Sequence, residues 1–187
     1  QSTTAGLTYM NKWNKDKSSV NGSFQLNDQD VTGRNVSITK TILPDTAFSN
    51  NTTAVFNSYR NRKKVNAFYE WQIDSSSTMK FKANGALING RKNNQYTGES
   101  ISEQTTIINS TKRTLSNETE NRDFTSELSW RKKLKKKGRT ISFTGNWSNN
   151  LKTGDGLLLA DNEFFDKTGT SVKQQDIDQK KTNNERQ

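Results

Sequence analysis

The chain has 187 residues, 29 Lys and Arg against 19 Asp and Glu, a formal net charge of +10, and neither cysteine nor histidine. This composition excludes disulfide frameworks, thiol nucleophiles, zinc sites built from Cys and His, and catalytic triads that need an imidazole. Apolar residues make up only 28%, far below the ~45–50% of ordinary soluble domains. The chain is therefore either disordered or folded without a large internal core, as in a transmembrane β-barrel whose apolar residues face lipid.

The first two predicted strands form a hairpin at about residues 4–27. Apolar residues alternate with polar ones from Ala5 to Trp13 and again from Val20 to Leu26. A period of two over this length predicts β-strands with one apolar face. The polar link between them has the length and composition of a hairpin turn. Sustained alternation of this kind argues against a disordered chain.

Two more hairpins are predicted at about residues 65–90 and 124–149. Each consists of two alternating segments joined by a tight polar turn, as in the first hairpin. The larger apolar residues of these segments are Val65, Tyr69, Trp71, Ile73, Met79, Phe81, Leu87, Phe124, Leu128, Trp130, Ile141, Phe143 and Trp147.

The links between the hairpins are much longer than the turns inside them. Residues 28–64 and 91–123 are rich in Asn, Ser, Thr and Gly and are expected to be long polar loops. The second strand can extend into the first loop as an outer β-ribbon, because the alternation continues through Val36, Ile38 and Ile42. Outer-membrane barrels alternate short periplasmic turns with long extracellular loops. The three tight turns are therefore predicted to lie at one end of the sheet and the long loops at the other.

Tryptophan recurs at one position of each hairpin. Trp13, Trp71 and Trp130 are 58 and 59 residues apart, each on the apolar side of a strand that enters a tight turn. Trp and Tyr favour the boundary between membrane and water, where barrels carry aromatic girdles. We therefore expect the three indoles to share one level. The predicted membrane-interface aromatics are Trp13, Trp71, Trp130, Tyr9, Tyr69 and Trp147.

These features predict an all-β fold, an antiparallel up-and-down meander of about six long strands (three hairpins) that is part of a transmembrane β-barrel in the cell outer membrane. Residues 1–165 are assigned to this barrel segment, and residues 166–187 to a polar loop or tail. The alternative is a soluble secreted β-sandwich or an adhesion or binding module, whose alternating faces pack two sheets together. Dependence of the folded state on detergent would separate the two.

Three stretches resemble the β-barrel region of TonB-dependent receptors and related outer-membrane proteins of Bacteroidetes-type bacteria. They are residues 6–13 with 20–27, residues 68–75, and residues 128–142 with the turn sequence Lys-Gly-Arg-Thr. The resemblance implies nutrient uptake across the outer membrane, with outer-membrane lipid as one partner and the TonB system as another, acting through a plug domain that is not present in this chain. It also implies a fragment, because the family builds its barrels from about 22 strands.

Other candidate chemistry is weak. No constellation of base, nucleophile and oxyanion donor can be recognised, so neither enzyme activity nor a cofactor is expected. Asp155, Asp161, Glu163 and Asp166 could offer oxygen ligands to calcium, but they lack the EF-hand spacing and are expected to be solvated loop charges. A basic run around the third turn could bind nucleic acid or anionic lipid, but we expect a solvated turn and no nucleic-acid partner. This run is Arg131, Lys132, Lys133, Lys135, Lys136, Lys137 and Arg139.

Overall fold

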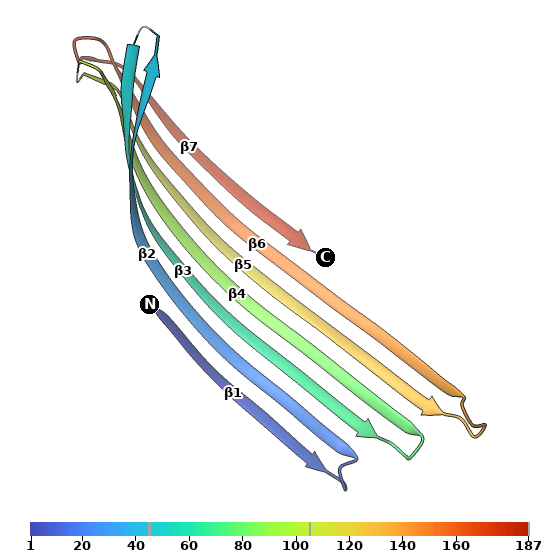
Figure 1. Cartoon of the computed structure of the whole chain (residues 1–187). Coiled ribbons are helices and arrows are strands. Elements are labelled where there is room, and N and C mark those ends of the chain that lie inside the picture. The colour runs from blue at the N-terminus through green and yellow to red at the C-terminus, as the bar shows by residue number, and fades with distance from the viewer. Residues whose placement is uncertain (45, 105, 187) are drawn as a thin grey trace.

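Seven strands in one antiparallel sheet make up the computed structural model, which describes residues 1–44, 46–104 and 106–186 (Figure 1). Each strand is hydrogen-bonded to the strand before it and the strand after it in the sequence, and β1 and β7 form the two edges, so the sheet is open. The strands are β1 Ser2–Trp13, β2 Ser18–Leu43, β3 Thr46–Gln72, β4 Ser77–Ser102, β5 Ile107–Lys133, β6 Thr140–Phe165 and β7 Ser171–Arg186.

The up-and-down antiparallel topology and the three hairpins are confirmed. β1 pairs with β2 from Trp13 opposite Ser18, and the β3–β4 and β5–β6 pairs close in the same way next to their turns. The links inside these hairpins all lie at the end of the sheet shown at the lower right of Figure 1, and the turns after β2, β4 and β6 lie at the opposite end. The predicted placement of the three tight turns at one end is therefore correct.

The prediction of two long polar loops is wrong. Residues 28–64 belong almost entirely to β2 and β3, which stay paired up to Leu43 opposite Thr46, and residues 91–123 continue β4 and β5 in the same way. Apolar residues are fewer there, and those on the convex face of β2, Val36, Ile38 and Ile42, belong to an extension of the second strand that the sequence correctly predicts. Thr, Ser and Asn side chains instead meet across the strands, as in the hydrogen bond from the Ser100 hydroxyl to the Asn50 side chain at 2.6 Å.

The predicted polar tail at residues 166–187 is also wrong over most of its length. Ser171–Arg186 form β7, which pairs with β6 from Phe165 back to Leu151. The strand has few apolar residues of its own, and the paired edge of β6 supplies the backbone partners that fix its extended conformation. The total is thus seven strands rather than about six, and the sheet extends beyond residue 165.

The turns carry the backbone conformations and side-chain hydrogen bonds that tight reversals require. Asn14, Lys15 and Asp16 all have positive φ, as do Gly138 and Gly169. In the turn after β3, the Asp74 carboxylate accepts hydrogen bonds from the Ser76 hydroxyl at 2.7 Å and the Ser76 N–H at 2.6 Å. These bonds hold the pKa of Asp74 below its usual value. The hydroxyl of Thr168, followed by backbone N–H groups, does the same for the pKa of Asp166.

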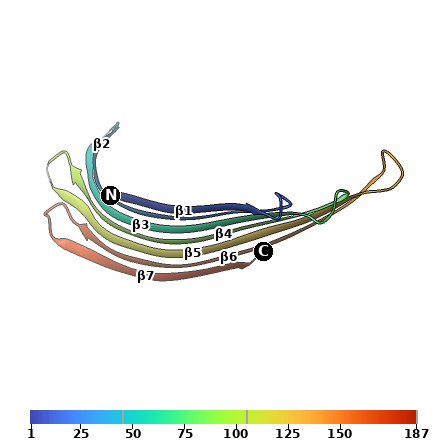
Figure 2. The ribbon, with the colours of Figure 1, turned by 90° about the horizontal axis from the view of Figure 1, so that it is seen from below.

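The sheet is a single curved layer with almost no interior. Among the described residues the buried hydrophobic side chains are only Ala47 and Ala160, and no large side chain is fully buried. Figure 2 shows that the strands bend lengthwise toward the side that faces the viewer in Figure 1, so this side is concave and the opposite side is convex. No helix among the described residues is long and apolar enough to cross a membrane.

The Asp74 turn predicts a specific dependence of stability on pH. The folded-state pKa lies below the unfolded value of ~3.9, so the carboxylate stabilises the fold above that pH, and the contribution is lost as the pH falls through the folded-state pKa. Asp74→Asn should therefore lower the urea midpoint of unfolding at pH 7, and the difference from wild type should shrink below pH ~4.

The control is Asp16→Asn in the turn after β1, where no side-chain hydrogen bond to the carboxylate is present among the described residues. This variant should show no comparable pH-dependent difference from wild type in its urea midpoint. An equal pH-dependent loss in the two variants would contradict the role assigned to the Asp74 hydrogen bonds.

Candidate functional site

The three hairpin tryptophans lie in one row across the convex face. Strand register places Trp13 opposite Ser18, Ser18 opposite Trp71, and so on through Met79 and Trp130 to Phe143. Directly opposed residues of an antiparallel pair point to the same face. The expectation that Trp13, Trp71 and Trp130 share one level is therefore confirmed, while their place at a membrane boundary remains a prediction.

Three further rows on the convex face carry no charge. Moving away from the turns, successive rows step by two residues along each strand, and each row crosses β1 to β6. The members of the three rows are Asn11, Val20, Tyr69, Phe81, Leu128 and Gly145; then Tyr9, Gly22, Ala67, Ala83, Ser126 and Trp147; then Leu7, Phe24, Val65, Gly85, Phe124 and Asn149. Together with the Trp row they form what we call the uncharged band.

The other predicted interface aromatics do not share the level of the three tryptophans. Tyr69 lies in the next row, and its ring stacks on Trp13 with the ring centroids 6.0 Å apart. Tyr9 and Trp147 lie two rows from the Trp row, in the middle of the uncharged band. The Trp147 ring contacts Phe124 at a centroid distance of 5.2 Å.

Charged side chains appear at one level on the far side of the band. The row that follows contains Lys63, Arg122 and Arg186, and the row after it contains Asp28 and Glu120. On the turn side the band ends at Lys132, ten residues from Arg122 on the same face of β5. Ten residues rise ~34 Å along a strand. Tilted by ~45°, they span ~24 Å, close to the ~25 Å apolar band of outer-membrane barrels.

The charged rows beyond the band are held in mixed networks. Arg91 donates to Glu118 at 2.8 Å, and Arg122 is paired with Glu120. The Tyr59 hydroxyl donates to Asp28 at 3.2 Å. Partial loss of hydration and the negative charge of Asp28 raise the pKa of Tyr59. Cations and anions are therefore balanced on this part of the convex face.

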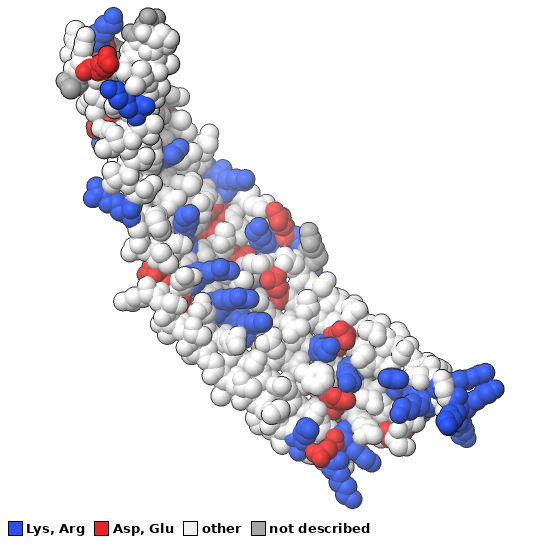
Figure 3. All heavy atoms as spheres, in the orientation of Figure 1, with Lys and Arg blue, Asp and Glu red and all other residues white. Residues whose placement is uncertain are grey.

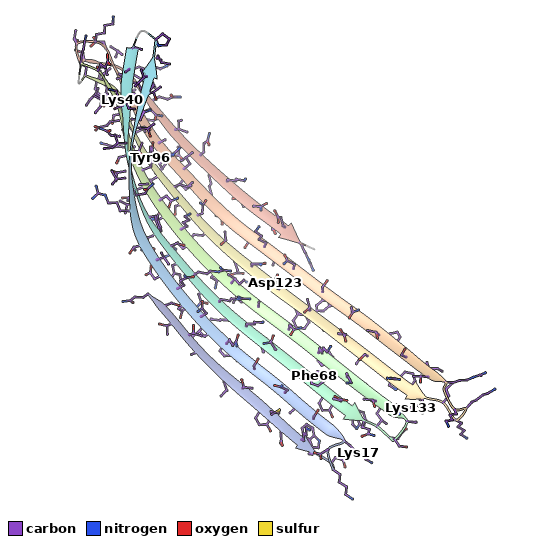
Figure 4. All side chains as sticks on the ribbon, viewed as in Figure 1. Lys17, Lys40, Phe68, Tyr96, Asp123 and Lys133 are labelled. Carbon is purple, nitrogen blue, oxygen red and sulfur yellow. The ribbon has the colours of Figure 1, made fainter. Side chains whose placement is uncertain are left out.

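The concave face is polar at the same height as the uncharged band. Lys80 pairs with Glu70 at 3.3 Å and Lys82 with Glu127 at 3.5 Å. Figure 3 shows opposite charges side by side in the turn-proximal half of the face toward the viewer, which is the concave face. Since the other face is uncharged at this height, the face that carries these ion pairs is the concave one. The exceptions are Met10 and Phe68, whose positions share this face (Figure 4).

The two charge clusters singled out from the sequence do not form compact sites. The basic run lies at the turn end of the sheet, where Lys133 is seen in Figure 4, and Arg131 is on the opposite face from Trp130 as expected. The acidic residues Asp155, Asp161 and Glu163 are spread along the convex side of β6. Within the described ranges no three Asp or Glu side chains are close enough to hold a metal ion.

Neither a protein-family model nor a curated protein matches this sequence. The resemblance to TonB-dependent receptors therefore remains a prediction from the residues that carry it. The features that bear on function are the contrast between the two faces of the sheet and the level at which that contrast ends.

The row of tryptophans predicts a measurable coupling. The Trp130 indole N–H donates to the Ser77 hydroxyl at 3.0 Å, and Ser77 is only 3% exposed. Ser77→Ala should lower the free energy of unfolding by about 0.5–1.5 kcal/mol, the usual net contribution of such a hydrogen bond. In a Trp130→Phe background, which lacks the donor, the same substitution should cost less. Urea titrations of the four proteins give the coupling, and equal costs in the two backgrounds would refute it.

Proposed function

We propose that this chain is a wall section of a transmembrane β-barrel in an outer membrane, with its convex face against lipid and its concave face lining a water-filled lumen. In this proposal it belongs to a transporter similar to TonB-dependent receptors and takes part in nutrient uptake. Outer-membrane lipid is the direct partner of the uncharged band. The TonB system would act through a plug domain outside this chain.

One observation carries the proposal, namely that four successive rows of the convex face are uncharged on all six strands from β1 to β6, and that charged residues return in the two rows that follow. Large apolar side chains in it stand open to solvent, with Leu7 72%, Phe143 60% and Trp147 58% exposed. Contiguous apolar surface of this kind marks contact with a membrane or another protein. A band of one height, bordered by charges on one side and by tryptophans and a basic turn on the other, matches the cross-section of a bilayer.

The curvature of the sheet favours lipid over a second protein layer. A sandwich encloses its apolar faces between two sheets ~10 Å apart, whereas the described residues of this chain form one sheet. In a barrel wall the outer surface is convex and apolar and the inner surface is concave and polar, which is the distribution found on these two faces.

The sheet edges indicate that further strands complete the wall. β1 is the edge strand at the height of the uncharged band, and no described strand pairs with its outer side. β7 covers β6 only from Leu151 onward, so among the described residues Thr140 to Asn149, which cross the band, have no neighbour on that side. Unpaired backbone groups are costly in hydrocarbon. Strands from outside this chain would have to pair with both edges in the membrane.

Fluorescence quenching in lipid vesicles tests the proposal. Four single-Trp proteins retain Trp13, Trp71, Trp130 or Trp147, with phenylalanine at the other three positions. The first three should be quenched alike and most strongly by lipids brominated near the headgroup. Trp147, two rows deeper, should respond more to bromine near the bilayer centre. Absence of quenching in all four, with the β-sheet retained in water, would overturn the membrane assignment.

A pair of adjacent substitutions tests which face meets lipid. Ala83 lies on the convex face in the middle of the band, and its neighbour Asn84 lies on the concave face. Ala83→Arg should destabilise the vesicle-inserted fold by ~2–4 kcal/mol, as for a cation near the bilayer midplane, and Asn84→Arg should cost little on the water-filled side. Both variants add the same charge to the same strand, so the reverse ranking in folding titrations would show that the faces are assigned the wrong way round.

A further inference from the structure

A second feature of the concave face lies beyond the uncharged band and is independent of lipid. Three successive rows there contain five cations and one carboxylate, Glu185, which accepts a hydrogen bond from Asn183. No carboxylate lies within ion-pair distance of any of the five among the described residues. The cations are Arg60, Arg62, Lys92, Lys152 and Lys181.

The middle one of these rows forms the floor of a groove. Its register runs from Arg60 through Gly90, Thr119 and Gly154 to Asn183. Gly90 is needed for this floor, because a Cβ atom there would come within 2.8 Å of the Thr119 hydroxyl. Further along, Gly154 of this row and Gly156 of the next line a hollow of about 440 Å³ over β5 to β7, which is within the usual size of ligand sites.

Cations lie in the rows on both sides of this groove. Arg62 and Lys152 belong to the row on the turn side, and Lys92 and Lys181 to the row on the opposite side. The hollow is lined by Lys152 and Lys181 from its two sides, by the Asn117 and Asn183 amides and by apolar Leu115 and Leu158; Glu118 and Asp155 also border it but belong to the convex face by register. It crosses β5 to β7, two strand spacings of ~4.8 Å, and the cation row on its turn side continues past it to Arg62 on β3. It therefore suits a long ligand that lies across the strands.

The basic excess is specific to the concave face. At the same height the convex face mixes cations with carboxylates, and two of its arginines are ion-paired, Arg91 with Glu118 and Arg122 with Glu120. Figure 3 shows Lys and Arg side chains gathered midway along the concave face over β3. Charges that only face solvent would need neither this concentration of cations on one face nor the glycines between the two rows of cations.

The aromatic residues near the groove each have their ring in contact with another part of the chain, and none of them lines the hollow. Tyr96, seen beyond the groove in Figure 4, has the Arg113 guanidinium 4.8 Å from its ring centroid. The Phe56 ring lies directly over Gly33. Recognition of nucleic acid by stacking needs free aromatic faces among the cations, and the groove presents none. The structure assigns this groove to a linear polyanion without aromatic rings, bound by charge and by side-chain amides. The inference stands on the concave face alone and does not require the barrel.

Binding of a linear polycarboxylate tests this assignment. The whole chain, folded in micelles of an uncharged detergent, is titrated calorimetrically with polygalacturonate and with its fully methyl-esterified form, which has the same backbone without the charge. Polygalacturonate should bind with an affinity that falls steeply as salt rises. Lys and Arg side chains displace the counterions held by the polymer, and added salt opposes their release. The ester should not bind. Equal binding of the two polymers would overturn the proposal.

Two matched sets of substitutions locate the binding surface. The concave set should weaken binding about 10- to 100-fold, since it removes four exposed ion pairs with the polymer. The convex set removes the same charge at residues outside the ion pairs and should change affinity less than about twofold. Equal losses in both sets would show attraction by net charge only. The concave set is Arg62→Gln, Lys92→Gln, Lys152→Gln and Lys181→Gln, and the convex set is Arg34→Gln, Lys63→Gln, Lys112→Gln and Lys180→Gln.

Two further measurements keep the result interpretable. Gly154→Leu fills the groove without changing charge and should also weaken polygalacturonate binding, with retention of the sheet checked by far-ultraviolet circular dichroism. Polyphosphate of equal charge should compete with polygalacturonate, which would show that the negative groups rather than the sugars are recognised. Tighter binding of oligothymidylate than of either polymer would mean that bases are read, and would refute a site for polyanions without aromatic rings.

Discussion

The hydrogen-bond register of the antiparallel sheet is the constraint on which both faces depend. From β1 to β6 it runs without a bulge through the half of the sheet next to the tight turns. A slip of one residue in any strand would carry its apolar side chains to the opposite face. Because the register holds, side chains that are distant in the sequence, such as Trp13 and Trp130, lie at one height. The uncharged band and the groove are both products of this alignment.

Because the sheet is a single layer without a core, its apolar residues can be kept from water only by the surroundings of the chain. Burial of apolar surface normally supplies the main driving force of folding, and here almost none occurs within the chain. The backbone hydrogen bonds shape the sheet, while the convex face needs an external apolar phase. The concave face can remain hydrated because its charges are paired or solvated at that height. This division explains how a chain with so few apolar residues can still present a continuous apolar surface.

How far the sequence predicts this fold depends on whether the two faces differ. Alternation reveals β1, the first part of β2, and the later hairpins because one face is apolar there. In residues 28–64 only Val36, Ile38 and Ile42 continue it, and β7 lacks it, so in these segments pairing with the neighbouring strand fixes the conformation. The spacing of Trp13, Trp71 and Trp130 was enough to predict their common level.

The features missed from the sequence are those that only the register brings together. Lys63 and Arg122 each precede a tryptophan by eight residues, Trp71 and Trp130 respectively, and this repeated spacing could have located the charged limit of the band. Gly90 and Gly154 offer no such signal. They are on different strands, separated by β5, and become one floor only when β4, β5 and β6 are paired.

The strictly sequential strand order has a consequence for how such a sheet can assemble and fail. Every strand contacts only its predecessor and its successor among the described residues. Stability is then close to a sum over neighbouring pairs, as in repeat proteins. A defect in one hairpin weakens two interfaces and leaves the distant ones intact. The sheet can therefore grow hairpin by hairpin in the order of the chain, and it can be undone from either edge without a collapse of the whole.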